Sequence, residues 1–307
     1  MYKVFIDGQH GTTGLRIYER FAKRKDIEVL TISEAERKDV NARLKKIEES
    51  DVTFLCLPDA ASKEIAEAAK DIDTIIIDAS TVFRCDDNWA YGLPELGPEY
   101  LQGVKTNKRI ANPGCHATGS ITVIAPLVKS GLIPADYPIT ITSLTGYSGG
   151  GKQMISDYEN PHDKELDAPR IYGLSQAHKH LPEIVKHCKL AAAPVFLPIV
   201  ASYYAGMLVT VGFINKTGKM LEDVHTIFTE FYKDQKFIQV APLNETPKML
   251  GSNNLFGKDY LKIYICGNDD RITVSSQFDN LGKGASGAAI ESMNIALGLD
   301  PALGLDF

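Results

Sequence analysis

The chain has 307 residues, of which 44% are hydrophobic and 23% are charged. This length predicts about two domains, and the apolar content excludes a wholly disordered chain. The formal net charge of −6 argues against a general nucleic-acid binder, which carries a basic excess. No stretch approaches the ~20 apolar residues of a membrane span, and the N-terminus lacks the apolar core of a signal peptide. The five scattered cysteines fit a reducing compartment, so we expect a cytoplasmic protein.

The first third of the chain alternates between strand and helix patterns. Residues 2–6, 27–32, 51–57 and 74–78 are apolar runs typical of strands. The segment that ends near residue 24 and residues 60–70 have helix patterns. Strands that alternate with helices predict a parallel sheet covered on both faces, which is the doubly wound, Rossmann-like α/β arrangement.

The pattern changes after about residue 119. Residues 137–145 and 204–212 alternate between apolar and polar side chains, and residues 260–266 and 271–278 read as a hairpin. These runs predict an α+β domain with a mainly antiparallel sheet. We therefore expect a nucleotide-binding domain at residues 1–116, completed by a C-terminal helix at 283–307. Residues 117–282 are expected to form the catalytic and oligomerisation domain.

Glycines recur at three-residue spacing directly after the first predicted strand, as Gly8, Gly11 and Gly14, with Thr12 and Thr13 between the last two. Such glycines permit a reversal at positive φ, a close approach of backbone amides to a pyrophosphate, and close packing of the helix on the sheet. The helix N-terminus then points amides at the anion. A loop without a ligand is the alternative, but the βαβ context favours dinucleotide binding.

The end of the second predicted strand discriminates NAD from NADP. Ser33, Arg37 and Lys38 form a plausible cup for the 2′-phosphate of NADP, whereas Glu34 would favour the ribose diol of NAD. A solvated charged loop is the alternative interpretation.

Cys115 follows an apolar strand end and Pro113-Gly114, and precedes a helix-like run. The helix dipole lowers the pKa of a thiol at such an N-terminus, so Cys115 is the predicted nucleophile. A buried, inert cysteine is the alternative, and it is our interpretation of Cys56 and Cys266.

A thiolate nucleophile needs an acid–base partner, and His178 and His180 are the candidates. Two residues apart, they share a face if the chain is extended, and Glu183 follows where a carboxylate could orient an imidazole. We expect no metal, because no third and fourth ligands lie at suitable spacing. The other histidines are expected to be structural or on the surface: His10, His116, His162, His187 and His225. Of these assignments, that of His116 is the weakest, because His116 adjoins Cys115. A nucleotide fold with a Cys–His pair indicates reduction of an acyl group through a thioester.

Six segments occur in one order along nearly the whole chain: GQHGTTG, DASTVFR, NPGCHATG, TGYSGGGK, SQAHKHLPE and DNLGKGASGAA. Together they resemble the N-acetyl-γ-glutamyl-phosphate reductases of arginine biosynthesis, in their shorter subtype. The resemblance implies an NADP-dependent phosphorylating semialdehyde dehydrogenase. Such an enzyme reduces N-acetyl-glutamyl 5-phosphate with NADPH to N-acetyl-glutamate 5-semialdehyde and phosphate.

The resemblance also implies roles for residues. Cys115 is the nucleophile, and we expect His180 to be the acid–base, with His178 in reserve, because Glu183 can pair with His180. The cofactor contacts implied are Gly8, Gly11, Thr12, Thr13, Gly14, Ser33, Arg37, Lys38 and Ser80, with Asn280, Lys283 and Gly284 near the nicotinamide. The substrate contacts are Arg84, Asn112, Ser148 and Gly149. For Arg84 a surface salt bridge is the alternative, and for Ser148 and Gly149 a flexible loop.

Two other classes of function stay open. Another acyl-phosphate reductase, resembling aspartate-semialdehyde dehydrogenase or the lysine-pathway aminoadipyl-phosphate reductase, would share the same logic. A non-catalytic NADPH-binding sensor would explain the glycine turn but not Cys115 beside a histidine pair. The expected partners are a small acyl-phosphate substrate and copies of the chain itself, as a dimer or tetramer, with no nucleic acid and no membrane.

Overall fold

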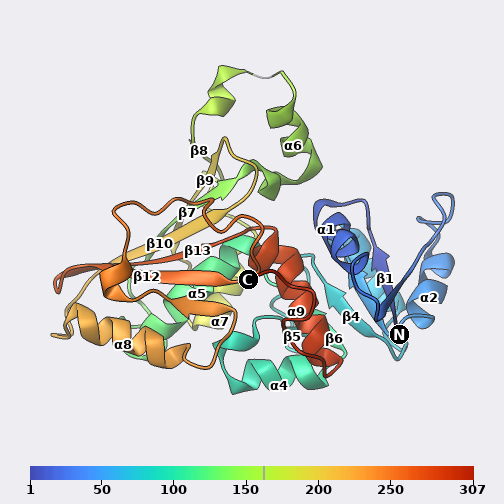
Figure 1. The fold of residues 1–307 in the computed structure, drawn as a ribbon, viewed down its shortest axis with the longest axis horizontal. Coiled ribbons are helices and arrows are strands. Elements are labelled where there is room, and N and C mark those ends of the chain that lie inside the picture. Colours follow the sequence, from blue (N-terminus) through green and yellow to red (C-terminus); the bar gives the residue numbers. More distant parts are fainter. Residues whose placement is uncertain (162) are drawn as a thin grey trace. The chain divides into compact units, whose positions relative to one another are not determined.

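The computed structural model describes residues 1–161 and 163–307, which form two compact units. The first unit comprises Met1–Gly114 and Ala285–Asp306, and the second comprises Cys115–Gly284 and Phe307. Each unit is built on one sheet, and Figure 1 shows the elements of both.

The first unit contains a six-stranded parallel sheet in the order β2-β1-β3-β4-β6-β5. Its strands are β1 (Tyr2–Asp7), β2 (Ile27–Leu30), β3 (Val52–Leu55), β4 (Ile75–Asp78), β5 (Ala90–Tyr91) and β6 (Arg109–Ala111). Its helices are α1 (Thr12–Phe21), α2 (Val40–Glu48), α3 (Asp59–Ala68), α4 (Pro98–Thr106) and α9 (Gly287–Ala296). The expected doubly wound parallel sheet is confirmed.

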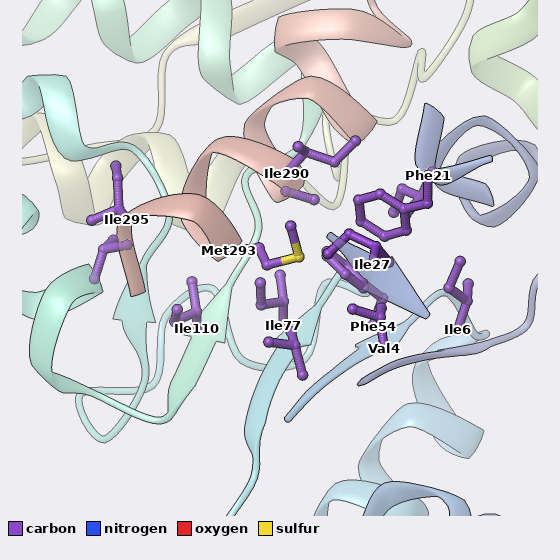
Figure 2. Packing of buried hydrophobic residues seen from close by; sticks show 14 residues of the cluster. Val4, Ile6, Phe21, Ile27, Phe54, Ile77, Ile110, Ile290, Met293 and Ile295 are labelled. Carbon is purple, nitrogen blue, oxygen red and sulfur yellow. The ribbon is translucent and has the colours of Figure 1, made fainter. Parts of the chain in front are cut away.

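Side chains at successive positions of a strand enter two different hydrophobic clusters, which explains the uninterrupted apolar runs in the sequence. Val4 and Phe54 pack with α1 and α9, whereas Phe5 and Leu55 belong to a second cluster that includes residues of α2 and α3. Figure 2 shows the first cluster, in which Met293 of α9 lies among strand residues. Both faces of the sheet are therefore buried, as parallel sheets require.

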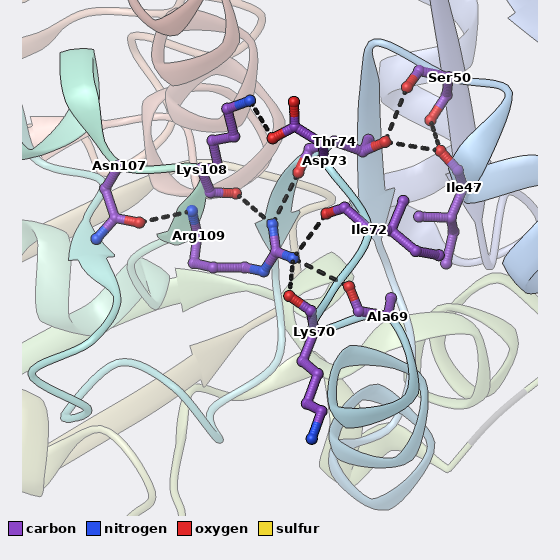
Figure 3. A network of polar contacts seen from close by, with 10 residues as sticks. All are labelled: Ile47, Ser50, Ala69, Lys70, Ile72, Asp73, Thr74, Asn107, Lys108 and Arg109. Carbon is purple, nitrogen blue, oxygen red and sulfur yellow. Dashed lines mark hydrogen bonds and ion pairs between the residues drawn. The ribbon is translucent and has the colours of Figure 1, made fainter.

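Arg109 of β6 fixes the turn that leads into β4. Its Nη1 donates to the carbonyl oxygen of Thr74 at 2.8 Å, and its Nη2 donates to those of Ala69, Lys70 and Ile72 at 3.0–3.1 Å (Figure 3). These carbonyls lie in the segment between α3 and β4. One guanidinium thus binds four carbonyls of that segment and fixes the entry into β4.

The second unit contains a seven-stranded mixed sheet in the order β11-β12-β13-β10-β7-β9-β8. Its strands are β7 (Thr140–Gly146), β8 (Arg170–Ile171), β9 (Val195–Ala201), β10 (Met207–Ile214), β11 (Ile238–Val240), β12 (Leu261–Gly267) and β13 (Arg271–Phe278). The pairs β7–β9 and β11–β12 are parallel, and the others are antiparallel, so the mainly antiparallel prediction is confirmed. The helices of this unit are α5 (Cys115–Lys129), α6 (Gly151–Glu159), α7 (Leu181–Cys188) and α8 (Leu221–Phe231).

Helix α5 is buried along most of its length and lies close against this sheet. A Cβ at Gly119 would lie 2.5 Å from Cγ2 of Val209, so only glycine permits this approach. Pro126 lacks the amide that would bond the carbonyl of Thr122, and the hydroxyl of Tyr232 donates to that carbonyl instead at 2.8 Å. The helix therefore keeps a buried proline without leaving that acceptor unsatisfied.

Candidate functional site

The glycine turn lies at the carboxyl end of β1, where the strand order reverses between β2 and β3. This switch point is the usual ligand edge of a doubly wound sheet. Gly8 adopts φ +85°, and a Cβ there would lie 2.3 Å from the carbonyl oxygen of Cys56. Gly11 is the N-cap of α1, and no side chain caps the amides of the first turn, so these amides can bind an anion. The turn therefore fits a pyrophosphate.

Gly14 has a different role from the one expected. A Cβ at Gly14 would lie 2.6 Å from the carbonyl oxygen of Gly8 and 2.9 Å from Cα of Gln9. The third glycine thus lets α1 pack onto the turn itself rather than onto the sheet.

The three residues of the predicted 2′-phosphate cup lie in an exposed segment after β2. Ser33 donates to Glu36 at 2.6 Å, and Nε of Arg37 lies 2.8 Å from a Glu34 oxygen in an exposed ion pair. Exposed pairs of this kind contribute little free energy, so a phosphate dianion would exchange for the Glu34 carboxylate at small cost. The role of the cup, including Lys38, stays a prediction.

A buried ion pair at the start of the turn was not predicted. Nε of Arg43, on α2, donates to Oδ2 of Asp7 at 2.7 Å, and both side chains are buried. Burial raises the pKa of the Asp7 carboxyl, while the Arg43 guanidinium opposes this shift. The pair anchors α2 to the residue that precedes Gly8. It joins residues 36 positions apart, so sequence spacing gave no signal of it.

Ser80, Arg84 and Asn112 lie together at the carboxyl edge of the same sheet. The Ser80 hydroxyl donates to Asp78 at 2.6 Å, and Nε of Arg84 donates to the carbonyl of Asn112 at 2.9 Å. Nη2 of Arg84 donates to the carbonyl of Ala79 at 3.1 Å. Arg84 is therefore a buried residue bound to main-chain carbonyls, and its binding of a substrate oxyanion stays a prediction.

Cys115 is the first residue of α5 in the second unit and is partly buried. Pro113 and Gly114 separate it from β6, because proline cannot donate to a strand ladder and so ends the extended segment. Gly284 approaches the cysteine closely, since a Cβ at Gly284 would lie 3.1 Å from the Cβ of Cys115. The helix N-terminus favours the thiolate form.

Three imidazoles gather in this unit near the start of α5. The ring centroids of His178 and His180 are 4.8 Å apart, and both lie within 5.6 Å of the ring of His116. The backbone amide of His180 donates to Nδ1 of His178 at 3.3 Å. Burial lowers the pKa of His178, and the Lys179 charge adds to that shift. The predicted histidine pair therefore lies beside the residue that follows the predicted nucleophile.

Glu183 lies in a helix, in the stretch that directly follows His180. His180 is the N-cap of α7, and Glu183 is the third residue of that helix, with both side chains buried. Its role in orienting His180 stays a prediction.

His116 is buried, and both ring nitrogens have close partners. Nδ1 lies 2.6 Å from the hydroxyl of Ser143, and Nε2 lies 2.6 Å from the hydroxyl of Tyr172. Burial lowers its pKa to about 3, with smaller contributions from His178 and Lys179. His116 is therefore a neutral imidazole enclosed in the fold. Tyr172 was not singled out in the sequence.

Asn280 lies between β13 and α9, and it contacts the loop after β7 within the second unit. Nδ2 of Asn280 donates to the hydroxyl of Ser148 at 3.0 Å, and its Oδ1 accepts from the amide of Gly206 at 2.8 Å. A Cβ at Gly149 would lie 3.8 Å from Nδ2 of Asn280. Lys283 is fully buried, with Nζ 5.0 Å from the ring centroid of Phe237. The structure thus brings Asn280 together with the predicted substrate loop.

Arg170 is a further functional candidate that the sequence did not reveal. Its Nη2 donates to the hydroxyl of Tyr158 at 2.9 Å, whereas its buried Nε has no acceptor among residues 1–161 and 163–307. It faces Val200 across the β8–β9 pair, and Phe196, on the same face of β9, contacts the His116 ring at 5.3 Å. A partly buried guanidinium without a carboxylate among the described residues suits an anionic ligand.

Three of the four other cysteines, Cys56, Cys188 and Cys266, are buried or partly buried. Burial raises the thiol pKa of Cys56, Cys188 and Cys266, which disfavours their thiolates, and Cys85 is exposed. Nε2 of His225 lies 2.9 Å from the carbonyl of Ala241. His162 lies outside the described residues. Within those residues, no group of three His, Cys, Asp or Glu side chains is arranged to hold a metal, and none of the helices has the length and apolarity to cross a membrane.

Two family models match the chain. Residues 3–104 match the NAD binding domain of semialdehyde dehydrogenase, and residues 115–280 match its dimerisation domain. The second match supports assembly of copies of this chain.

Relatives match along almost the whole chain. An N-acetyl-gamma-glutamyl-phosphate reductase of Brucella ovis is 42% identical over 306 residues, covering 96% of this chain and 99% of the relative. A protein of the same name from Brucella anthropi is 43% identical over 307 residues, covering 96% and 98%.

Solved structures share the fold. Aspartate semialdehyde dehydrogenase II of Vibrio cholerae gives a TM-score of 0.74 at 17% identity, covering 97% of this chain and 99% of that one. Aspartate semialdehyde dehydrogenase of Candida albicans, solved with NADP, gives 0.69 at 17% identity, covering 96% and 98%.

Proposed function

The chain belongs to the N-acetyl-γ-glutamyl-phosphate reductase family of semialdehyde dehydrogenases, and on that premise we propose the reaction that it catalyses. It reduces N-acetyl-L-glutamyl 5-phosphate with NADPH to N-acetyl-L-glutamate 5-semialdehyde and phosphate, as a step of arginine biosynthesis. The observation that carries this assignment is the position of Cys115 at the start of α5, next to a cluster of imidazoles. A hydride transfer alone would need no such thiol.

The first unit is the proposed NADP(H)-binding domain. The turn from Gly8 to Gly14 would hold the pyrophosphate through the amides of Thr12 and Thr13, because no side chain caps the start of α1. Ser33, Arg37 and Lys38 would contact the 2′-phosphate, with Ser80 at the same edge of the sheet. We assign Asn280, Lys283 and Gly284 to the nicotinamide end.

The chemistry begins at Cys115, whose thiolate attacks the acyl carbon and forms a carbon–sulfur bond while the carbon–oxygen bond to phosphate breaks. Backbone amides at the start of α5 would stabilise the oxyanion. When bound, NADPH supplies the hydride that reduces the resulting thioester. His180 donates a proton to the oxygen of the hemithioacetal and accepts it again as the aldehyde and the Cys115 thiolate separate. Glu183 would orient His180.

Substrate binding is divided among several groups in this proposal. Ser148 and Gly149 would contact the substrate from the loop after β7, and Asn112 and Arg84 would bind the phosphate. Arg170 is the proposed partner of the α-carboxylate. It shares a sheet face with Phe196, and its Nε has no acceptor among the described residues. The assembly would be a cytoplasmic dimer or tetramer formed through the second unit.

The direct test runs the reaction in reverse. N-acetyl-glutamate 5-semialdehyde is mixed with NADP⁺ with and without phosphate, beside parallel assays with NAD⁺ and with aspartate 4-semialdehyde. We expect NADPH formation that requires phosphate and is fastest with the N-acetylated substrate. Faster turnover of aspartate 4-semialdehyde would reassign the substrate. Cofactor binding without any turnover would favour a sensor.

A further inference from the structure

The edge of β9 that faces β8 is paired with a strand over part of its length. β8 pairs with Val200 and Ile199 of β9. Beyond β8, the amide of Tyr172 donates to the carbonyl of Pro198 at 3.0 Å. Phe196 lies two residues further along β9 and is buried, so its amide and carbonyl also need hydrogen-bonding partners.

The side chain of Gln176 supplies both partners. Its Nε2 donates to the carbonyl oxygen of Phe196 at 2.8 Å, and its Oε1 accepts from the amide of Phe196 at 2.8 Å. A carboxamide carries the same donor and acceptor as a peptide group, so this side chain takes the place that a further residue of a neighbouring strand would occupy. The two bonds fix Gln176 at one position along β9.

The backbone of Gln176 adopts an unusual conformation at this position. Its φ is +56°, in the left-handed region that residues with a side chain rarely adopt. The amide of Gln176 donates to the carbonyl of Gly173 at 3.0 Å, and Gly173 also has a positive φ of +62°, so the turn between them is tight. Such a conformation costs free energy and persists where surrounding contacts require it. Gln176 is exposed to solvent, so its two bonds to Phe196, rather than burial in a core, account for the conformation.

The anchored turn leads directly into the histidine pair. The ring centroids of His178 and Phe196 are 5.0 Å apart, so His178 packs on the same residue that Gln176 binds. A Cβ at Gly173 would lie 3.7 Å from Cδ2 of His178, which places the start of the turn against this imidazole as well. The ring centroid of His180 lies 4.8 Å from that of His178. A shift of Gln176 along β9 would therefore move both imidazoles relative to Phe196.

We propose that Gln176 is a positioning residue for the reaction, whose carboxamide fixes the loop that carries His178 and His180 to the edge of β9. This inference rests on the proposed function only in taking the histidine pair as the source of the acid–base. A misplacement of about 1 Å can cost about 100-fold in rate, so loss of the anchor should lower kcat. The proton transfer takes place in the transition state, so KM should depend little on the anchor.

Two substitutions separate the carboxamide from the backbone turn. Gln176→Gly removes both bonds to Phe196 and relaxes the left-handed residue, whereas Gln176→Met removes the bonds and keeps an unbranched side chain of similar length. Lys189→Gly is the matched control, because Lys189 has φ +55° at the end of α7 in the same unit. An effect of relaxing a left-handed residue by itself would appear in that control.

Steady-state kinetics of the full-length protein measure the effect on the reaction, with NADP⁺, phosphate and N-acetyl-glutamate 5-semialdehyde as substrates. We expect kcat to fall by about 10–100-fold in both Gln176 variants, with KM for the aldehyde within about threefold of wild type. Lys189→Gly should keep wild-type values. A wild-type kcat in Gln176→Gly, or a loss confined to KM, would overturn the proposal.

Amide hydrogen exchange tests the anchor without substrate. The amide proton of Phe196 is bonded to Gln176, so its exchange, and that of residues 172–180, should be about tenfold faster in both Gln176 variants and unchanged in the control. Wild-type exchange at Phe196 in Gln176→Gly would also overturn the proposal. If Gln176→Met does not fold, Gln176→Gly, which carries no strained residue, decides alone. Failure of the proposed function would show instead as absence of turnover in wild type, and the exchange at Phe196 then decides whether Gln176 holds the loop.

Discussion

A Cβ atom at Gly8 would lie 2.3 Å from the carbonyl oxygen of Cys56, and Gly8 itself adopts φ +85°. The turn is therefore closed against the end of β3 by two separate constraints, a backbone conformation and a close contact. Both constraints act at the point where the pyrophosphate is proposed to bind.

Gly8→Ala is expected to weaken NADPH binding by about tenfold or more and to destabilise the fold by about 1–3 kcal/mol, since the turn must move away from Cys56. Gly131→Ala is the control, because Gly131 also has a positive φ of +74° but nothing lies within 4 Å of its Cβ position. Fluorescence titration with NADPH and thermal unfolding measure both effects. Equal behaviour of the two variants would show that the contact with Cys56 is unimportant.

The two histidines of the pair are expected to differ. His180→Asn should lower kcat by about 10²–10³-fold, since a general acid–base is lost, while His178→Asn should lower it much less. Steady-state kinetics in the reverse direction give the ranking. The opposite ranking would exchange the two roles.

Arg170→Gln should lower kcat/KM for N-acetyl-glutamate 5-semialdehyde by about 100-fold, because a charge-assisted contact to the α-carboxylate is lost. The loss should be small with N-acetyl-4-aminobutanal, which lacks only that carboxylate. Arg271→Gln, an exposed residue at the start of β13, is the control for a lost arginine. Equal losses on both aldehydes would indicate that Arg170 has only a structural role.

The buried imidazole of His116 should make the protein sensitive to mild acid. Its pKa is about 3 in the folded chain against an ordinary value of 6.5, so between these values the unfolded chain binds the additional proton. The free energy of unfolding therefore falls as the pH drops from 6.5 towards 3, by at most about 1.4 kcal/mol per pH unit from this group. His178, whose pKa is also lowered, acts in the same direction.

Urea unfolding at several pH values tests this dependence. His116→Gln should flatten the slope below pH 6.5, because the variant no longer carries the buried imidazole. An unchanged slope in His116→Gln would contradict the assignment of a neutral, buried imidazole.

Much of the first unit follows from local sequence, because its strands are buried on both faces and read as uninterrupted apolar runs. In the second unit, β9 was not predicted. Pro198 lies within it, and proline is unfavourable inside a strand. Here Pro198 still supplies the carbonyl that accepts from Tyr172. The parallel pairing of β7 with β9 likewise depends on contacts that no local pattern encodes.

The residues of the site also divide into those that local sequence indicates and those that only the fold brings together. Cys115 and the histidine pair are apparent in the sequence because each has a local context, a helix start in one case and a two-residue spacing in the other. Tyr172 and Arg43 acquire their importance only through partners 56 and 36 residues away. Such contacts depend on the strand order, which short-range periodicity does not specify.

The proposed reaction passes the acyl group through a thioester on Cys115, and a burst experiment detects this intermediate. The enzyme is mixed with NADP⁺ and N-acetyl-glutamate 5-semialdehyde without phosphate, NADPH is followed in the first turnover, and peptides are then analysed by mass spectrometry. We predict one NADPH per subunit and an N-acetylglutamyl group on the Cys115 peptide, released when phosphate is added, with no burst in Cys115→Ser. A burst that survives in Cys115→Ser, or an acyl group on another cysteine, would show that Cys115 is not the nucleophile.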